Sequence, residues 1–217
     1  MRVKCAVIFA AMVTALSAQE PAGEWEVAPT VGYVRLSKKP IGSVNQTSPQ
    51  DDDTKLTARQ PSYGATFTWN SKGYYGIEAG VWRSRARIDS KIDPGDGKPV
   101  LESGTVTQNQ IFVNGVSYFM PRGERFRPYV TAGAVVQFWN TPALANWGIG
   151  GSKNLGFNYG GGVKIRLLKP VLFRLDVRDI WAGAPYGLQY ANSSDTSVRS
   201  PGLYRQLQGT VGIGFVF

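Results

Sequence analysis

The chain has 217 residues, no histidine, a single cysteine and a formal net charge of +9 at pH 7. The lack of histidine excludes the usual hydrolase and protease sites, in which an imidazole near neutral pKa acts as the base. Cys5 falls in an expected leader, so the mature chain has no disulfide and no thiol chemistry. We therefore expect no enzyme, no cofactor and no metal site.

Residues 1–18 have the order of a secretory signal peptide. Two basic residues precede a short apolar stretch, and small residues follow it. Cleavage after Ser17 or Ala18 would leave residues 19–217 as one domain. The apolar stretch is too short for a membrane-spanning helix, and no later segment approaches the roughly 20 apolar residues that such a helix needs.

Period-two alternation between turn-forming residues predicts eight strands. They span about 24–36, 61–70, 73–85, 106–119, 126–139, 155–168, 171–182 and 204–217. Most are long enough for the roughly 9–11 residues with which a tilted strand crosses an outer membrane. The predicted fold is therefore all-β: an eight-stranded antiparallel up-and-down transmembrane β-barrel.

The predicted links alternate between short and long. Short links occur at 71–72, 121–125 and 169–170, and long polar links at about 37–60, 86–105, 140–154 and 183–203. This is the order of periplasmic turns and extracellular loops. With both termini on the periplasmic side, every long link lies outside the cell, whereas a soluble sandwich has no reason to sort its loops in this way.

Charged residues in the predicted strands fall on the face opposite the apolar one. Near the bilayer midplane an arginine or lysine would cost about 2–4 kcal/mol on the lipid face, so we assign these charges to the lumen. The predicted lumen charge cluster is Glu78, Lys164, Arg166, Arg174, Asp176 and Arg178. It is either a salt-bridge plug or the gate of a narrow path, which would favour anions because the basic residues outnumber the acidic ones.

Two further sets of residues belong near the membrane interfaces. Arg83, Arg85 and Arg87 share one face where the third strand leaves the outer leaflet, and Arg35 leaves the first strand at a similar height. We expect them either to contact lipid headgroups or to form a solvated rim. Aromatic residues near strand ends predict two girdles: Trp25, Trp69, Tyr74, Tyr75, Phe119, Phe126, Tyr129, Phe138, Trp139, Trp181 and Tyr204.

The last strand alternates strictly and stops on an aromatic residue. One face of this strand carries Phe217, Phe215, Ile213, Val211 and Leu207. The outer-membrane assembly machinery recognises endings of this kind. The chain resembles the OmpA-like and OmpW-like superfamily of small eight-stranded outer-membrane barrels. The resemblance rests on this ending, on the leader, on the order of strands and loops, and on the segment Pro128-Tyr-Val-Thr-Ala-Gly-Ala134 after a turn. The resemblance covers essentially the whole mature chain.

The resemblance implies export to the bacterial outer membrane and a monomeric barrel. In contrast to the larger members of the superfamily, we expect no appended peptidoglycan-binding domain. The expected partners of the barrel are outer-membrane lipid, lipopolysaccharide and the barrel assembly machinery, which would recognise the C-terminal strand at Phe215 and Phe217. No nucleic acid is expected after export. The expected role is structural or surface-interacting, with a largely occluded basic lumen. The alternatives are a narrow pore or carrier for small anions or apolar molecules, and an adhesion or recognition barrel that acts through its extracellular loops.

Overall fold

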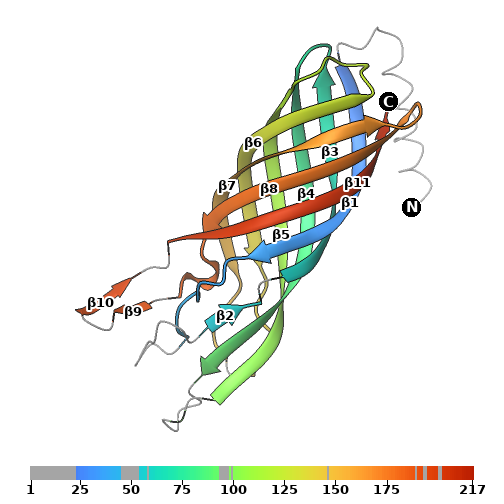
Figure 1. The fold of residues 1–217 in the computed structure, drawn as a ribbon. Helices are drawn as coiled ribbons and strands as arrows, with labels where there is room; N and C mark the ends of the chain where they lie inside the picture. The colour runs from blue at the N-terminus through green and yellow to red at the C-terminus, as the bar shows by residue number, and fades with distance from the viewer. Residues whose placement is uncertain are drawn as a thin grey trace, which may run out of the picture.

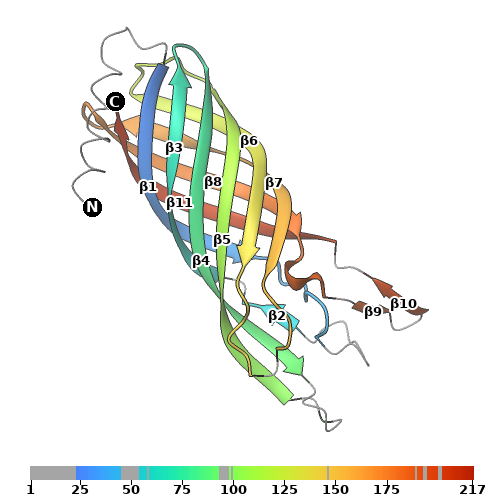
Figure 2. The same ribbon diagram turned by 180° about the vertical axis from the view of Figure 1, so that it is seen from behind.

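The computed structural model describes residues 23–44, 54–57, 59–92, 98, 100–145, 147–188, 190–192, 195–199 and 202–217. The expected signal peptide at residues 1–18 lies outside the described residues. Figures 1 and 2 show the chain from opposite sides. Within the described part of the chain, no helix has the length and apolar character needed to cross a membrane.

Eight long strands form one closed antiparallel barrel, which confirms the predicted fold (Figure 1). They are β1 (Gly23–Leu36), β3 (Arg59–Ser71), β4 (Tyr75–Ile92), β5 (Val100–Tyr118), β6 (Phe126–Trp139), β7 (Ser152–Arg166), β8 (Val171–Gly183) and β11 (Leu203–Val216). The order around the ring is β4-β3-β1-β11-β8-β7-β6-β5, and pairing of β4 with β5 closes it. The small elements are β2 (Thr54–Leu56), the 3₁₀ turn η1 (Pro185–Gly187), β9 (Tyr190–Asn192) and β10 (Asp195–Arg199).

The short and long links lie at opposite ends of the barrel. The links after β3, β5 and β7 are short and lie at the end where β1 starts and β11 finishes, which we call the turn end. The described parts of the other links, with β2, η1, β9 and β10, lie at the opposite end, the loop end (Figures 1 and 2). The structure thus has the predicted alternation of links.

The hairpin of β4 and β5 is longer than predicted and projects beyond the other strands at the loop end (Figure 2). Residues 86–105 were expected to form a loop, but most of them continue the two strands, which pair as far as Ile92 and Val100. Alternation does continue here, since Ala86 and Ile88 are buried while Arg85 and Arg87 are exposed. The charged outer face resembled a loop because this part of the hairpin lies beyond the apolar band.

The barrel wall has apolar side chains outside and polar ones inside. Val31, Ile77, Val113, Leu175 and Val211 are all exposed on the outer surface. The fourth of the eight long strands, β5, follows the same rule. The inward positions are filled by buried side chains, as expected in a barrel of only eight strands.

Three of the predicted girdle residues face the interior instead. Tyr129, Trp139 and Tyr204 are at most 4% exposed. They occupy the inward positions of the alternation, because their neighbours Val130, Phe138 and Leu203 are less buried and point outward. The prediction used only their closeness to a strand end. It was therefore wrong about which face of the barrel wall carries them.

Candidate functional site

A cluster of buried ion pairs fills the turn-end half of the barrel. Arg174 lies at its centre, with Nη1 2.5 Å from Glu78 Oε2 and 3.6 Å from Glu26 Oε1. Its Nε lies 2.6 Å from Asp176 Oδ2. All four side chains are buried. Charges removed from water need close partners, and each carboxylate here has one.

Two further cations extend this cluster. Arg178 Nη2 lies 2.5 Å from Glu78 Oε1 and 3.4 Å from Asp176 Oδ1. Lys164 Nζ lies 2.5 Å from Glu26 Oε2 and donates a hydrogen bond to Tyr118 Oη at 2.9 Å. We call the six residues Glu26, Glu78, Lys164, Arg174, Asp176 and Arg178 the central network. With three carboxylates and three cations, the central network is formally neutral.

The central network contains five of the six residues predicted for the lumen cluster. The sixth, Arg166, lies nearer the turn end, is 23% exposed and pairs with Glu24 at 3.3 Å. Glu26 was missed, although it alternates with Trp25 and Val27 in the first strand. Glu24 and Glu26 supply two more carboxylates, which cancel the excess of two basic groups in the predicted cluster. Arg127, which is buried next to Tyr118, adds one further cation.

The ion pairs of the central network cross the whole lumen. Glu78 lies on β4, and both of its arginine partners lie on β8. Three strands separate β4 from β8 in either direction around the ring, so the two strands face each other across the barrel axis. The ion pairs between these two strands therefore span the lumen.

Two more layers follow the central network toward the loop end. Trp82, Phe112, Val135 and Ile180 form an apolar cluster, and the Arg178 guanidinium lies 4.8 Å from the centre of the Trp82 ring. Beyond them lies a layer of glutamines from β5, β6 and β11. Gln206 Oε1 accepts hydrogen bonds from Gln108 at 3.1 Å and Gln110 at 3.0 Å, and Gln206 Nε2 donates to Gln137 at 3.1 Å.

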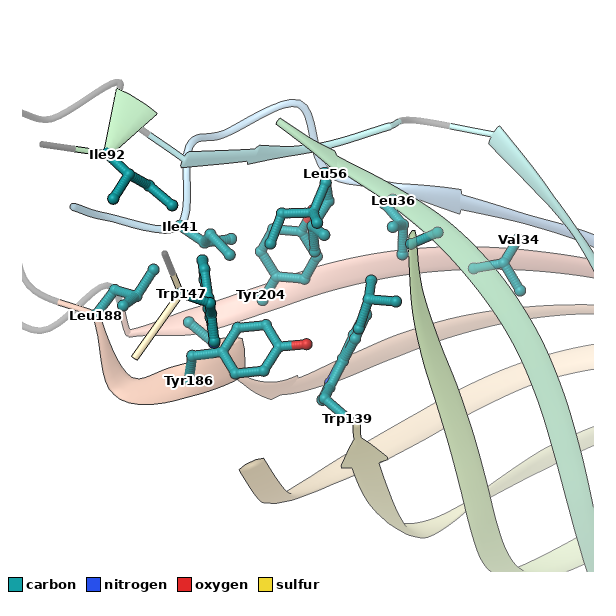
Figure 3. Packing of buried hydrophobic residues seen from close by; sticks show 14 residues of the cluster. Val34, Leu36, Ile41, Leu56, Ile92, Trp139, Trp147, Tyr186, Leu188 and Tyr204 are labelled. Carbon is teal, nitrogen blue, oxygen red and sulfur yellow. The ribbon is translucent and has the colours of Figure 1, made fainter. Parts of the chain in front are cut away.

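A large apolar cluster lies at the loop end (Figure 3). We call it the loop-end cluster; its members are Val34, Leu36, Ile41, Leu56, Ala86, Ile88, Ile92, Val106, Trp139, Trp147, Ala184, Tyr186, Leu188 and Tyr204. The Tyr186 ring contacts Trp147 and Trp139 edge-on, at centroid distances of 5.0 and 6.5 Å. Its hydroxyl donates to the Asn140 carbonyl oxygen at 2.8 Å, and burial raises the pKa of Tyr186 above its usual value.

Gly162 of β7 makes room for Tyr129, a buried side chain that donates a hydrogen bond to Asp176 of the central network. A Cβ atom on Gly162 would lie 2.1 Å from the Leu175 carbonyl oxygen and 2.8 Å from Tyr129 Oη, so Gly162→Ala should lower the free energy of unfolding by about 1–3 kcal/mol. Gly209→Ala is the control, because no atom lies within 4 Å of its added Cβ. Urea titration of both variants in lipid vesicles checks this prediction, and equal stabilities would contradict it.

The four arginines predicted at the headgroup level lie on the outer wall near the loop end. Arg35, Arg83, Arg85 and Arg87 are all exposed, and Arg87 also pairs with Asp89 at 3.1 Å. Exposed tyrosines lie beside them: Tyr33 is two residues before Arg35, and Tyr63 is paired with Arg83. Their contact with lipid remains a prediction.

Comparison with known proteins supports this architecture. The sequence matches the family described as outer membrane protein beta-barrel domain over residues 8–215. No curated protein sequence matches the chain. The fold is similar to that of the outer membrane protein OprG from Pseudomonas aeruginosa, with 18% identity, 90% of this chain and 96% of that chain covered, and a TM-score of 0.63.

Two further solved structures share the fold. Outer membrane protein AlkL is 12% identical, with 93% of each chain covered and a TM-score of 0.56. Neisserial surface protein A is 11% identical, with 89% of this chain and 97% of that chain covered and a TM-score of 0.52. At such identities the likeness concerns the fold alone. The family match, in contrast, extends over nearly the whole sequence, and the chain therefore belongs to the outer membrane protein β-barrel domain family.

Proposed function

We propose that this outer-membrane barrel has a structural and surface-interacting role and that its lumen is closed to solutes. The observation that carries the proposal is the pairing of Glu78 with Arg174 and Arg178 across the barrel axis. A path along the axis would have to separate these groups. Unpaired buried charges cost several kcal/mol per ion, so such an opening would be rarely populated.

The layers beyond the central network support closure at other heights. The apolar cluster around Trp82 disfavours ions at this height, because its one polar side-chain group, Trp82 Nε1, already donates to Thr30 Oγ1. The glutamine layer joins β5, β6 and β11 through side-chain hydrogen bonds. An ion entering from the loop end would meet each of these layers in turn.

The outer wall supports contact with the membrane and its assembly system. The exposed Arg35, Arg83 and Arg85 lie where phosphates of lipopolysaccharide would be within reach. Phe215 and Phe217 are exposed at the turn end of the chain's last strand, which suits recognition by the barrel assembly machinery. Since the barrel closes on itself without an open edge, the proposed state is a monomer.

Chloride influx into liposomes tests the closed lumen. Vesicles that contain the refolded protein and a chloride-quenched dye should lose fluorescence no faster than protein-free vesicles. Vesicles with a large general porin serve as the positive control. Influx that rises in proportion to the amount of folded protein would favour the narrow anion pore instead.

A second function, a carrier of apolar molecules, is favoured by the loop-end cluster. Its indole nitrogens Trp139 Nε1 and Trp147 Nε1 are buried and have no hydrogen-bond acceptor within the described part of the chain. A bound apolar molecule with one polar acceptor would satisfy such a group. Entry would require displacement of the rings of Tyr186 and Trp147 from their present contact.

Binding of an apolar fluorescent ketone to the protein in detergent-free nanodiscs tests the carrier. Saturable binding that Trp147→Phe weakens, with folding unchanged, is the result that this function requires. Phenylalanine keeps an aromatic ring and removes the donor together with the five-membered part of the indole. Binding that is neither saturable nor sensitive to Trp147→Phe would leave the loop-end cluster as a packed cap.

A further inference from the structure

A small basic pocket lies on the outer wall at the loop end. It has a volume of about 330 Å³ and is lined by Arg35, Leu36, Ser37, Lys38, Arg205 and Leu207. Three of these six residues are cations, and they come from β1, the link after it and the neighbouring strand β11. We call this hollow the rim pocket. Its size is at the lower end of the range for small-molecule sites.

The backbone that forms the rim pocket is held in place by hydrogen bonds. Ser37 N donates to the Arg205 carbonyl oxygen at 3.0 Å, which extends the pairing of β1 with β11. Tyr204 Oη donates to the Ser37 carbonyl oxygen at 2.7 Å. Lys39 N donates to Ser37 Oγ at 3.2 Å. The link that carries Lys38 is therefore tied to the barrel wall.

Arg205 is oriented in advance. Its Nη2 lies 2.7 Å and its Nε 3.0 Å from Asp179 Oδ2, and its guanidinium lies over the Trp181 ring at 5.4 Å. Asp179 is itself fixed by a 3.2 Å hydrogen bond from Tyr159 Oη. No hydrogen bond involves Arg205 Nη1 in the described residues, so one edge of the guanidinium remains available to a ligand. A planar guanidinium held in this way suits a phosphate oxygen.

The charges of the rim pocket are not balanced within the described structure. Arg35 lies directly opposite Arg59 in the pairing of β1 with β3, and both side chains are exposed on the same face. Like charges at opposed cross-strand positions are destabilising. Neither Arg35 nor Lys38 forms an ion pair with any described residue. A bound anion would relieve this repulsion.

The height of the rim pocket matches the lipid headgroups. Tyr33, Tyr159 and Trp181 lie on the outer wall beside it, and such rings belong at the boundary between hydrocarbon and water. Leu207, which pairs with Arg35 in the β1–β11 ladder, gives the pocket an apolar floor that continues into the exposed band of β11. The pocket thus opens toward the membrane as well as toward water.

We propose that the rim pocket binds a phosphate group carried by a glycolipid of the outer leaflet. Arg35 and Lys38 supply the charge, and Arg205, positioned by Asp179, supplies an oriented donor. The inference rests on the membrane placement in the proposed function. It extends the predicted headgroup contacts to Arg205, which was not among them. The apolar floor favours a lipid-borne phosphate over a free one.

Binding of lipid A with and without its phosphates tests the proposal. The wild-type protein in phosphatidylcholine nanodiscs should retain phosphorylated lipid A in native mass spectra and should bind dephosphorylated lipid A much more weakly. At about 1 kcal/mol for each cation near a charged surface, Arg35→Gln with Lys38→Gln should weaken retention about 30-fold. Both positions are exposed, so the double variant keeps the packing of the barrel.

Arg125→Gln with Lys153→Gln is the matched control, because it removes two exposed cations from other parts of the surface. It should bind phosphorylated lipid A like the wild type. If both double variants bound phosphorylated lipid A equally weakly, the attraction would depend on net charge alone. That result would overturn the proposal that the rim pocket is a phosphate site. Displacement of lipid A by an equal concentration of inorganic phosphate would overturn the assignment to a glycolipid. Chloride influx tests the closed lumen separately. A negative result for the rim pocket can therefore be distinguished from a negative result for the closed lumen.

Discussion

Glu78→Gln is expected to lower the free energy of unfolding of the barrel by about 3–5 kcal/mol, the usual result of removing one partner from a buried ion pair. Glutamine has nearly the same size, so the loss comes from charge. Without the carboxylate, Arg178 keeps only Asp176 at 3.4 Å as an ion-pair partner among the described residues. Arg174 still pairs with Asp176 and Glu26.

Urea titration in phosphatidylcholine vesicles, followed by tryptophan fluorescence, measures this effect. Glu124→Gln is the control, because Glu124 is exposed in the link between β5 and β6. Its stability should remain within about 0.5 kcal/mol of the wild type, as is usual for surface substitutions. If the two variants were equally stable, the central network would not hold the barrel together.

Val211→Arg should destabilise the barrel by about 2–4 kcal/mol in a bilayer, because the substitution places a charge on the lipid face near the midplane. Val211 lies in the middle of β11 between Val31 and Leu175, and all three side chains are exposed. The measurement is the same titration in vesicles of phosphatidylcholine. An unchanged stability would mean that this band does not face hydrocarbon.

Leu101→Arg separates the effect of depth from the effect of exposure. Leu101 is 66% exposed, more than Val211 at 41%, but it lies in the part of the β4–β5 hairpin that projects at the loop end. Its substitution should cost no more than about 1 kcal/mol, as for arginine near the interface. A larger loss at Leu101 than at Val211 would place the membrane at a different height on the barrel.

The fold could be predicted from sequence because alternation is a local signal. Ile77, Glu78 and Ala79 already show which side of β4 faces lipid, without knowledge of the neighbouring strands. The alternation of apolar and polar residues was lost where the outer face of a strand no longer contacts lipid. Beyond the apolar band the outer face is polar, as at Arg85 and Arg87, so the end of β4 resembled a loop although Ala86 and Ile88 continued the buried face.

The central network could be predicted only in part, because partners are set by register and by the ring order. Sequence showed that Glu78 and Arg174 point inward, but only the closed ring shows that β4 and β8 face each other. Glu26 was missed although it shares the inward face of β1 with Glu24. The contact of Tyr186 with Trp147 joins two long links, and no periodic pattern predicts such a contact.

Single-channel recording in a planar bilayer tests the central claim, a closed lumen, most directly. With the refolded wild-type protein inserted, the pairing of Glu78 with Arg174 and Arg178 across the axis predicts no steady unitary current at either polarity. Insertion must be shown independently, by the protection of the barrel from added protease. Steady unitary currents from protein that is inserted and folded would contradict the account.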